Sequence, residues 1–529
     1  MGEIPRRGAA VAGRPGSKRA AGALAAAALL ISAGATACGD GDQAETGPLN
    51  AQKLSWNDCP APSAAQGAGE GEPAPLPDGT EWQCSTLKVP LDWSKPDGER
   101  IDLALIRAKA KDQDRRIGSL VFNFGGPGGS GVATLPPAAK EDYTTLHTRY
   151  DLVSFDPRGV GNSEGVRCLD DKAQDAASAT DSTPDNAAEE KASLALTEKT
   201  AAACEKNSGT VLPHVDTADA ARDMDLMRQV LGDDKLHYFG ISYGTELGAV
   251  YAHLFPQKVG RAVFDAVVDP THDPEQSSLG QAKGFQLALD NFLKDCAKDG
   301  GSCPTGADPA QGGKRITELL ARLDAKPLPT TDGRQLTQTR ALNGIAQALY
   351  SKDYWSYLKQ GLEEAQQLGT GNFLLALSDA MTGRDQEGHY SNLQSANTAI
   401  ACADAKQRYT AADVRAKLPT FRQASPVFGE FLAWGMLQCT GWPVEGQSDI
   451  LDVAAKGSAP IVIVGNTGDP ATPYEGARRM ADGLGKGVGI EVTNKGQGHG
   501  SYGTGACVTN AVNAYLLNGK VPPNGKVCT

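Results

Sequence analysis

Five consecutive residues, Gly240-Ile241-Ser242-Tyr243-Gly244, could supply a nucleophile. They follow a short strand-like run at 235–239 and precede a helix-compatible stretch at 245–254. A Gly-x-Ser-x-Gly at such a junction forms a turn so tight that the serine adopts a strained backbone and presents its hydroxyl above the sheet. We therefore predict that Ser242 is a catalytic nucleophile. The alternative is an ordinary turn, because a chain with 62 glycines can produce the pattern by chance.

The base that such a serine requires can be sought by its order along the chain. On this kind of turn the serine is followed first by the acid and then by the histidine. His499 lies in a glycine-rich loop after the last predicted strand, whereas His389 falls in a helix-rich region. His499 is therefore the predicted base, and a surface-loop histidine is the alternative.

The acid that orients the base should stand at the end of a late strand. Asp469 follows the apolar run 461–464 and precedes His499 by 30 residues, so its carboxylate can accept the second imidazole N–H. Asp265 and Asp269 lie around an earlier predicted strand at 261–268 and remain alternatives, because some hydrolases take their acid from that position. Asp469 is the predicted acid.

An acyl-transfer site also needs N–H donors for the oxyanion. The residue after the nucleophile, Tyr243, should supply one backbone N–H. The glycine-rich segment 123–131, which follows another predicted strand, should supply a second, because glycines let the backbone approach the substrate closely. We predict Gly126 as that second donor.

The same glycine-rich segment also matches a dinucleotide-binding fingerprint. Gly126, Gly128 and Gly131 have the G-x-G-x-x-G spacing, and Asp156 at the end of the next strand could bind a ribose. Pro127 inside the turn counts against this interpretation. The N-terminal pattern described below predicts export, and an exported protein would find little nicotinamide cofactor outside the cell. The dinucleotide hypothesis also leaves the serine, the acid and the histidine unexplained.

Elements that could position these residues alternate along the chain. The expected strands are 101–107, 119–124, 152–155, 236–239, 261–268, 460–464 and 489–493. The clearest helix is 216–231, which Asp216 or Thr217 can cap. Such alternation favours a mainly parallel sheet. With the serine turn, it predicts an α/β-hydrolase fold whose core occupies 81–270 and 431–529, and helix-compatible stretches predict an inserted lid at 271–430.

The N-terminus has the pattern of a targeting segment. A basic region is followed by an uncharged apolar stretch at 20–33 and by Ala35-Thr36-Ala37, a small-x-small cleavage site. A signal peptide at 1–37 would leave Cys38 as the first mature residue, as lipidation requires. Because Ala35 replaces the leucine usual in lipoproteins, ordinary secretion remains an alternative. Residues 38–80 are then expected to form a tether.

Cysteine content and charge agree with an exported protein. Besides Cys38 there are ten cysteines, an even number suited to an oxidising compartment. Proximity along the chain pairs them as Cys59/Cys84, Cys168/Cys204, Cys296/Cys303, Cys402/Cys439 and Cys507/Cys528, although a sequence cannot fix connectivity. The formal charge is −12, and residues 1–37 hold five basic residues and one acidic, which leaves the mature chain at about −16. This acidity argues against a nucleic-acid partner.

With these residues in view, the chain resembles the secreted tripeptidyl aminopeptidases, which are related to the prolyl iminopeptidases among the α/β-hydrolases. The segments that carry the resemblance span most of the mature chain: Asn123–Gly131, Asp156–Ser163, Gly240–Thr245, Ala399–Asp404, Asp469–Pro473 and Gly498–Gly500. Phe124 departs from the proline or histidine usual in this family. Because the oxyanion donors are backbone groups, we expect little loss of function from that difference.

The resemblance implies release of short peptides, often tripeptides, from a free N-terminus. An exopeptidase of this kind needs a carboxylate to hold the substrate ammonium, and Asp404 and Glu246 are the candidates. Each could instead have a structural or surface role. No metal or organic cofactor is required, the expected partners are peptide substrates, and any membrane contact is expected only through a lipid on Cys38.

Other functions remain open from the sequence. A carboxylesterase or lipase of the cell envelope could use the same serine, acid and histidine. An endopeptidase would differ by cleaving peptides with blocked N-termini. A non-catalytic binding lipoprotein with a hydrolase-like fold would contain the same elements without activity.

Overall fold

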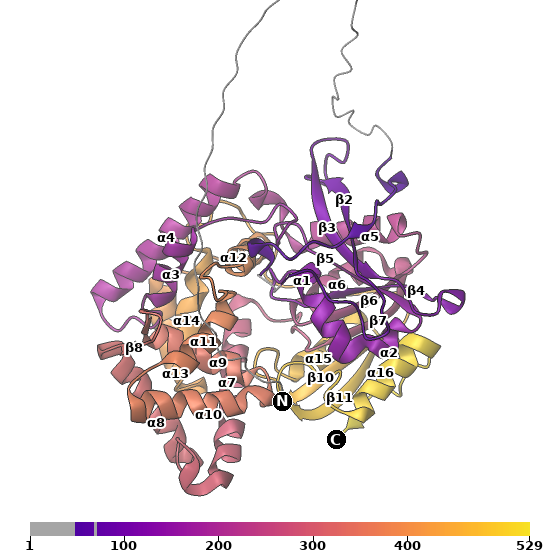
Figure 1. The fold of residues 1–529 in the computed structure, drawn as a ribbon. Coiled ribbons are helices and arrows are strands. Elements are labelled where there is room, and N and C mark those ends of the chain that lie inside the picture. Colours follow the sequence, from indigo (N-terminus) through magenta and orange to yellow (C-terminus); the bar gives the residue numbers. More distant parts are fainter. Residues whose placement is uncertain (1–47, 68–70) are drawn as a thin grey trace, which may run out of the picture. The chain divides into compact units, whose positions relative to one another are not determined.

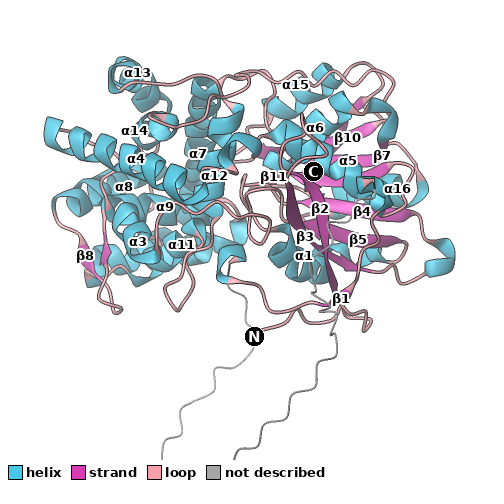
Figure 2. Ribbon diagram, turned by 90° about the horizontal axis from the view of Figure 1, so that it is seen from above, coloured by secondary structure: helices cyan, strands magenta, loops and turns pink. Residues whose placement is uncertain are grey.

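The computed structural model describes residues 48–67 and 71–529, so the predicted signal peptide and Cys38 lie outside the described residues. Within this part of the chain the core is a ten-stranded sheet (Figures 1 and 2). Its strands, in spatial order, are β1 (Asn57–Asp58), β2 (Gln83–Pro90), β3 (Arg100–Ala108), β5 (Tyr150–Phe155), β4 (Gly118–Asn123), β6 (Leu236–Ile241), β7 (Val259–Asp265), β10 (Ile461–Gly468), β11 (Gly489–Gln497) and β12 (Lys526–Cys528). The strands from β5 to β12 run parallel, and β1, β2 and β3 pair antiparallel.

The central strands are buried on both faces. In β4, Leu120 and Phe122 pack on one face and Val121 on the other, as the two-residue period of a strand requires. The first face is covered by α1 (Gly131–Ala138), α2 (Thr144–His147) and α16 (Ala506–Asn518). The opposite face is covered by α5 (Thr217–Val230), α6 (Tyr243–Leu254) and α15 (Glu475–Leu484). This layering confirms the predicted α/β-hydrolase fold.

A helical layer lies beside the sheet in both views (Figures 1 and 2). It contains α7 (Pro274–Cys296), α8 (Pro309–Ala325), α9 (Gln338–Leu349), α10 (Trp355–Glu363), α11 (Asn372–Thr382), α12 (Leu393–Asp404), α13 (Ala411–Ala424) and α14 (Gly429–Gly435), with a short hairpin of β8 (Leu328–Pro329) and β9 (Gln335–Leu336). Two helices from earlier in the chain join it, α3 (Asp171–Ala179) and α4 (Ala187–Ser208). Arg340 of α9 binds Asp175 of α3 at 3.1 Å, and Leu194 of α4 packs against the cluster around α13 and α14.

All five cysteine pairs expected from proximity are disulfides in the structure. Such bonds persist in oxidising compartments, which favours export of the protein. Among residues 48–67 and 71–529, no helix has the length and apolarity needed to cross a bilayer.

The expected tether at 38–80 is wrong for its described part. Residues 48–67 and 71–80 pack on the core instead, because Cys59 is bonded to Cys84 and the apolar Leu76 is buried. Gln66, which a tether would expose to solvent, is also buried. Its side-chain N–H donates to Asp156 at 2.8 Å, and its side-chain oxygen accepts from Asn162 at 2.9 Å.

Gln66→Ala is therefore expected to destabilise the fold by roughly 1–3 kcal/mol, because the buried carboxylate of Asp156 loses a hydrogen-bond donor. Thermal unfolding followed by circular dichroism would measure the loss. Gln360→Ala, on the exposed surface of α10, is the control and should leave the melting temperature unchanged. Equal melting temperatures for both variants would show that the hydrogen bonds of Gln66 contribute nothing to stability.

Candidate active site

The turn between β6 and α6 has the geometry that the sequence predicts. Ser242 has φ +58° and ψ −127°, a left-handed conformation that is strained for any residue other than glycine. A Cβ on Gly240 would lie 2.3 Å from the Gly244 carbonyl oxygen, and a Cβ on Gly244 would lie 2.4 Å from the Asn123 carbonyl oxygen. Both flanking positions therefore require glycine, and Ser242 is held at the tip of the turn.

His499 and Asp469 meet at the carboxyl ends of β11 and β10. The imidazole Nδ1 lies 2.8 Å from Oδ1 and 3.0 Å from Oδ2 of the carboxylate. The carboxylate also accepts N–H groups from Ala471 at 3.0 Å, Thr472 at 2.9 Å and Gly500 at 3.3 Å. Because an ionised carboxylate only accepts, Nδ1 carries a proton and Nε2 is left as the basic nitrogen.

The surroundings of the imidazole favour its protonated form. Burial opposes the charge, but the charge and hydrogen bond of Asp469, together with the charge of Asp265, outweigh it, so the pKa of His499 is raised. Such a shift is typical of a histidine that must accept a proton and hold it.

Tyr350, at the end of α9, contacts the same histidine from the helical layer. Its carbonyl oxygen accepts the His499 backbone N–H at 2.7 Å, and its ring stands edge-on to the imidazole with 5.2 Å between centroids. Tyr350 was not among the residues predicted from the sequence. An isolated tyrosine in a helix-rich stretch carries no signal for contact with a loop about 150 residues later.

The other candidate acids and histidines are engaged elsewhere. Asp265 accepts backbone N–H groups and makes no hydrogen bond to the imidazole. Asp269 accepts from Thr271 and pairs with Arg479. His389 binds Asp171 at 2.9 Å on the exposed surface. The structure thus brings Asp469 to His499 and places these alternatives at other contacts.

The glycine-rich segment after β4 lies against the serine turn. A Cβ on Gly125 would lie 2.8 Å from the Ser242 Cβ and 3.1 Å from the Tyr243 nitrogen, so the two segments touch. Tyr243 is the first residue of α6, where helices leave N–H groups without intrahelical partners. Gly126 has φ +114°, and its N–H makes no hydrogen bond within residues 48–67 and 71–529, whereas those of Gly125 and Gly129 do.

Asp156, the ribose ligand of the dinucleotide hypothesis, is a buried support for this loop. One carboxylate oxygen accepts from the Ser130 hydroxyl at 2.6 Å and from the Val132 backbone N–H. The other oxygen accepts from the Asn162 backbone N–H and from the Gln66 side-chain amide. With no exposed surface and four donors, the carboxylate has no room for a ribose. The structure therefore contradicts the dinucleotide hypothesis at this residue.

Two carboxylates, Glu246 and Asp404, lie behind Tyr243. Thr217 donates to Asp404 through its backbone N–H at 2.8 Å and its hydroxyl at 2.6 Å, and the Thr217 hydroxyl is 2.6 Å from the Tyr243 hydroxyl. Burial raises the pKa of both carboxyls, and the charge of Asp404 raises that of Glu246 further. Thr217 was predicted only as a possible helix cap, because its contact with a residue of α12 leaves no trace in the local sequence.

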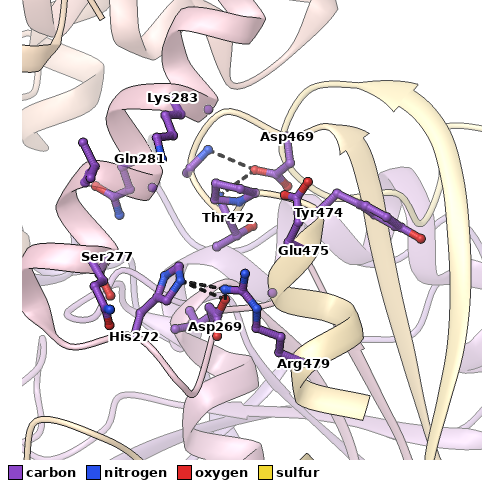
Figure 3. Close-up of a pocket in the computed structure, with 18 of the residues that line it drawn as sticks. Asp269, His272, Ser277, Gln281, Lys283, Asp469, Thr472, Tyr474, Glu475 and Arg479 are labelled. Atoms are coloured by element: carbon purple, nitrogen blue, oxygen red, sulfur yellow. Dashed lines mark hydrogen bonds and ion pairs between the residues drawn. The ribbon is translucent and has the colours of Figure 1, made fainter. Parts of the chain in front are cut away.

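A cavity of about 820 Å³ opens beside the loop that carries the acid. It lies between α7 and residues 467–479, and Figure 3 shows Asp269, His272 and Arg479 converging on one another within it. The Arg479 guanidinium donates to His272 at 2.7 Å and also binds Asp269. Thr472, which lines the cavity, has its hydroxyl 3.4 Å from Nδ1 of His499. Since Ser242 is not a lining residue, the cavity adjoins the acid loop and not the nucleophile.

Comparisons with known proteins identify the family. Residues 425–528 match the family model described as TAP-like protein. Serine protease Hip1 of Mycobacterium tuberculosis is 37% identical over 525 residues, with 96% of each chain covered. Carboxylesterase B of the same organism is 37% identical over 514 residues, with 94% of each covered. Tripeptidyl aminopeptidase of Streptomyces lividans is 30% identical over 481 residues, which cover 90% of this chain and 86% of that protein. The chain therefore belongs to the tripeptidyl aminopeptidase family of α/β-hydrolases and is a serine hydrolase.

Proposed function

We propose that this serine hydrolase is an exported exopeptidase, which releases short peptides, with tripeptides as the expected product, from free N-termini. Ser242 attacks the scissile carbonyl while Nε2 of His499 accepts its proton. Asp469 keeps the proton of the imidazole on Nδ1 and stabilises the imidazolium. The backbone N–H groups of Tyr243 and Gly126 bind the oxyanion, and the imidazolium gives its proton to the leaving amine as the scissile C–N bond breaks. Water, deprotonated by the same histidine, then hydrolyses the acyl-enzyme and frees Ser242.

The carboxylate pair beside Tyr243 is the observation that favours an aminopeptidase over an esterase. Asp404 is held by Thr217, but Glu246 makes no hydrogen bond or ion pair with any described residue, and burial dominates its raised pKa. Both carboxyl groups are half-buried, and a carboxylate that is largely removed from water without a partner is costly. A substrate ammonium would supply the missing positive charge, so we assign Glu246 and Asp404 as the amine site.

The length of α12 supports a tripeptide as the released product. Asn397 of this helix donates to the Pro127 carbonyl at 3.1 Å, next to the proposed oxyanion donor, and Asp404 is the last residue of the helix. Seven residues at the helical rise separate these two points by about 10 Å. Three residues of extended peptide span about 10 Å, and a single residue only about 3 Å.

Anchoring is a further part of the proposal. A signal peptide at 1–37 followed by lipidation of Cys38 would attach the protein to the outer side of the membrane. The cysteine lies outside the described residues, and this assignment rests on the cleavage pattern and on the five disulfides.

The test is hydrolysis of matched tripeptide amides of one fluorophore, with free and with acetylated N-termini, beside a short-chain acyl ester. We expect cleavage confined to the free-amine tripeptide, and loss of that cleavage in Ser242→Ala. Cleavage of the acetylated peptide would indicate an endopeptidase. Cleavage of the ester alone would replace the peptidase by an esterase, as the name of the mycobacterial carboxylesterase would lead one to expect.

A further inference from the structure

Asp265, at the end of β7, contacts both halves of the catalytic machinery. Its backbone carbonyl accepts the Ser242 N–H at 3.1 Å. Its side-chain Oδ2 accepts the N–H groups of Ser501 at 2.9 Å and Tyr502 at 2.8 Å, the second and third residues after His499. One residue therefore fixes the backbone of the nucleophile and the backbone of the loop that carries the base.

The local backbone explains why this side chain points into the site. β7 lies between β6 and β10, and Asp265 is in register with Ile241 on one side and with Val464 on the other. The next residue, Ala266, is buried and has φ +56°, a left-handed conformation that is unfavourable for alanine. The chain thus turns sharply after the strand, and the carboxylate remains at the carboxyl end of β7, beneath the His499 loop.

The carboxylate is deeply buried and only partly satisfied. Asp265 is 2% exposed, and its Oδ1 has no hydrogen-bond partner among the described residues. The groups that face it are Asp469 from the loop after β10, His499 from the loop after β11, and the phenol of Tyr143. Burial and the charge of Asp469 raise the pKa of Asp265, against the lowering effect of the two loop N–H groups and of His499. The imidazole is the one member of this set that can become positively charged, and its charge favours the ionised form of Asp265.

We infer that Asp265 is a positioning residue, which sets the separation of Ser242 and His499 and provides a second negative charge that stabilises the imidazolium. Two carboxylates then stabilise one imidazolium. Asp469 does so through its hydrogen bond to Nδ1, and Asp265 does so through its charge, without a hydrogen bond. This inference rests on the proposed roles of Ser242 and His499, but it does not depend on whether the substrate is a peptide or an ester.

Asp265→Asn tests the charge separately from the shape. The amide oxygen can accept both loop N–H groups, while the amide nitrogen takes the place of the unpartnered oxygen. We expect the acid limb of the kcat/KM profile to move to lower pH by roughly one unit, because the imidazolium loses a neighbouring charge. Asp265→Ala, which removes the acceptor as well, is expected to lower kcat by roughly a hundredfold as the base loop shifts.

Two measurements do not depend on turnover. The His499 imidazole, assigned by comparison with His499→Gln, should titrate in NMR spectra at lower pH in Asp265→Asn than in the wild type. Tyr350 and Thr472 also face this imidazole, but neither is altered in the variant. In the wild type, the amide protons of Ser501 and Tyr502 should exchange slowly because both bind a buried carboxylate.

The control is Asp269→Asn, the other carboxylate after β7, which pairs with Arg479 and should leave the His499 titration in place. An unchanged His499 titration in Asp265→Asn, or rapid exchange of the two amides in the wild type, would overturn the inference. Activity that survives in His499→Gln would instead refute the proposed function, so the two failures are distinguishable.

Discussion

Asp469→Asn is expected to lower turnover by roughly 10⁴-fold, the loss that the same exchange produces in other serine hydrolases with this arrangement. In the wild type Oδ1 accepts from Ala471 and Thr472, so the asparagine oxygen should occupy that side. The amide NH₂ would then take the Oδ2 position, 3.0 Å from Nδ1 of His499, and by donating to Nδ1 it would compete with the bond from the Nδ1 proton to the oxygen 2.8 Å away. The imidazole proton would move to Nε2, which could no longer accept the Ser242 proton.

The measurement is steady-state kcat with the preferred substrate, for wild type, Asp469→Asn and Asp269→Asn, with circular dichroism to show that each variant is folded. Asp269→Asn is the matched control, because it removes a carboxylate that pairs with Arg479 and does not touch the imidazole. An Asp469→Asn enzyme with normal turnover would exclude Asp469 as the acid. The acid would then have to be Asp265 or Asp269.

The sequence predicts the centre of the fold better than its edges. All seven expected strands exist, as β3, β4, β5, β6, β7, β10 and β11. Six of them are parallel, and central parallel strands such as β4, β5 and β10 contain apolar runs that stand out from their surroundings. β1, β2 and β12 of the main sheet were not predicted, nor was the short hairpin of β8 and β9. β2 mixes polar and apolar residues and ends at a proline, and β1 and β12 have only two and three residues. Such strands form because a neighbour offers free hydrogen-bonding groups, which no local pattern records.

The candidate site also has a part that the sequence predicts and a part that it does not. Ser242, Asp469 and His499 follow from chain order, because each stands at the end of a recognisable strand and a sheet brings such ends together. Asp265 was predicted only as an alternative acid around the expected strand 261–268, and its bonds to the Ser501 and Tyr502 backbone depend on the path of a loop. Contacts made across the helical layer are harder still to predict, since the contact of Tyr350 with His499 depends on how α9 packs against the sheet domain.

The expected tether failed for a related reason. Residues 39–80 are rich in alanine, glycine, glutamate and proline, a composition typical of linkers. Composition averages over the segment, whereas packing depends on a few members of it. Cys59, Gln66 and Leu76 are three members that bind the described part of this segment to the core.

Glu246→Gln should separate function from stability, because the two effects are expected to have opposite signs. The glutamine keeps the size of the side chain and removes the charge proposed to bind the substrate ammonium. The kcat/KM of the free-amine tripeptide is expected to fall by roughly a hundredfold, the loss typical of removing one partner of a buried charge pair. Its ratio to the kcat/KM of the acetylated peptide should fall with it.

The same variant should be more stable than the wild type at alkaline pH. Burial and the charge of Asp404 raise the pKa of Glu246, so the folded protein retains a proton at pH values where the unfolded chain has released it. Because the folded state binds more protons, the wild type loses stability as pH rises from the ordinary carboxyl range near 4 through the raised pKa. Glu246→Gln does not have this loss. Its melting temperature should match that of the wild type near pH 4 and exceed it at pH 8.

Melting temperatures at both pH values, with Glu205→Gln on the exposed surface of α4 as the control, decide between an amine site and a structural role. A glutamate that serves the fold would make the glutamine variant less stable at pH 8 and would leave the free-amine preference intact. If the glutamate binds the substrate, the glutamine variant should be more stable at pH 8 and less selective for free amines than the wild type. The natural chain would then retain a half-buried carboxyl group without a partner because the ammonium of the substrate completes it.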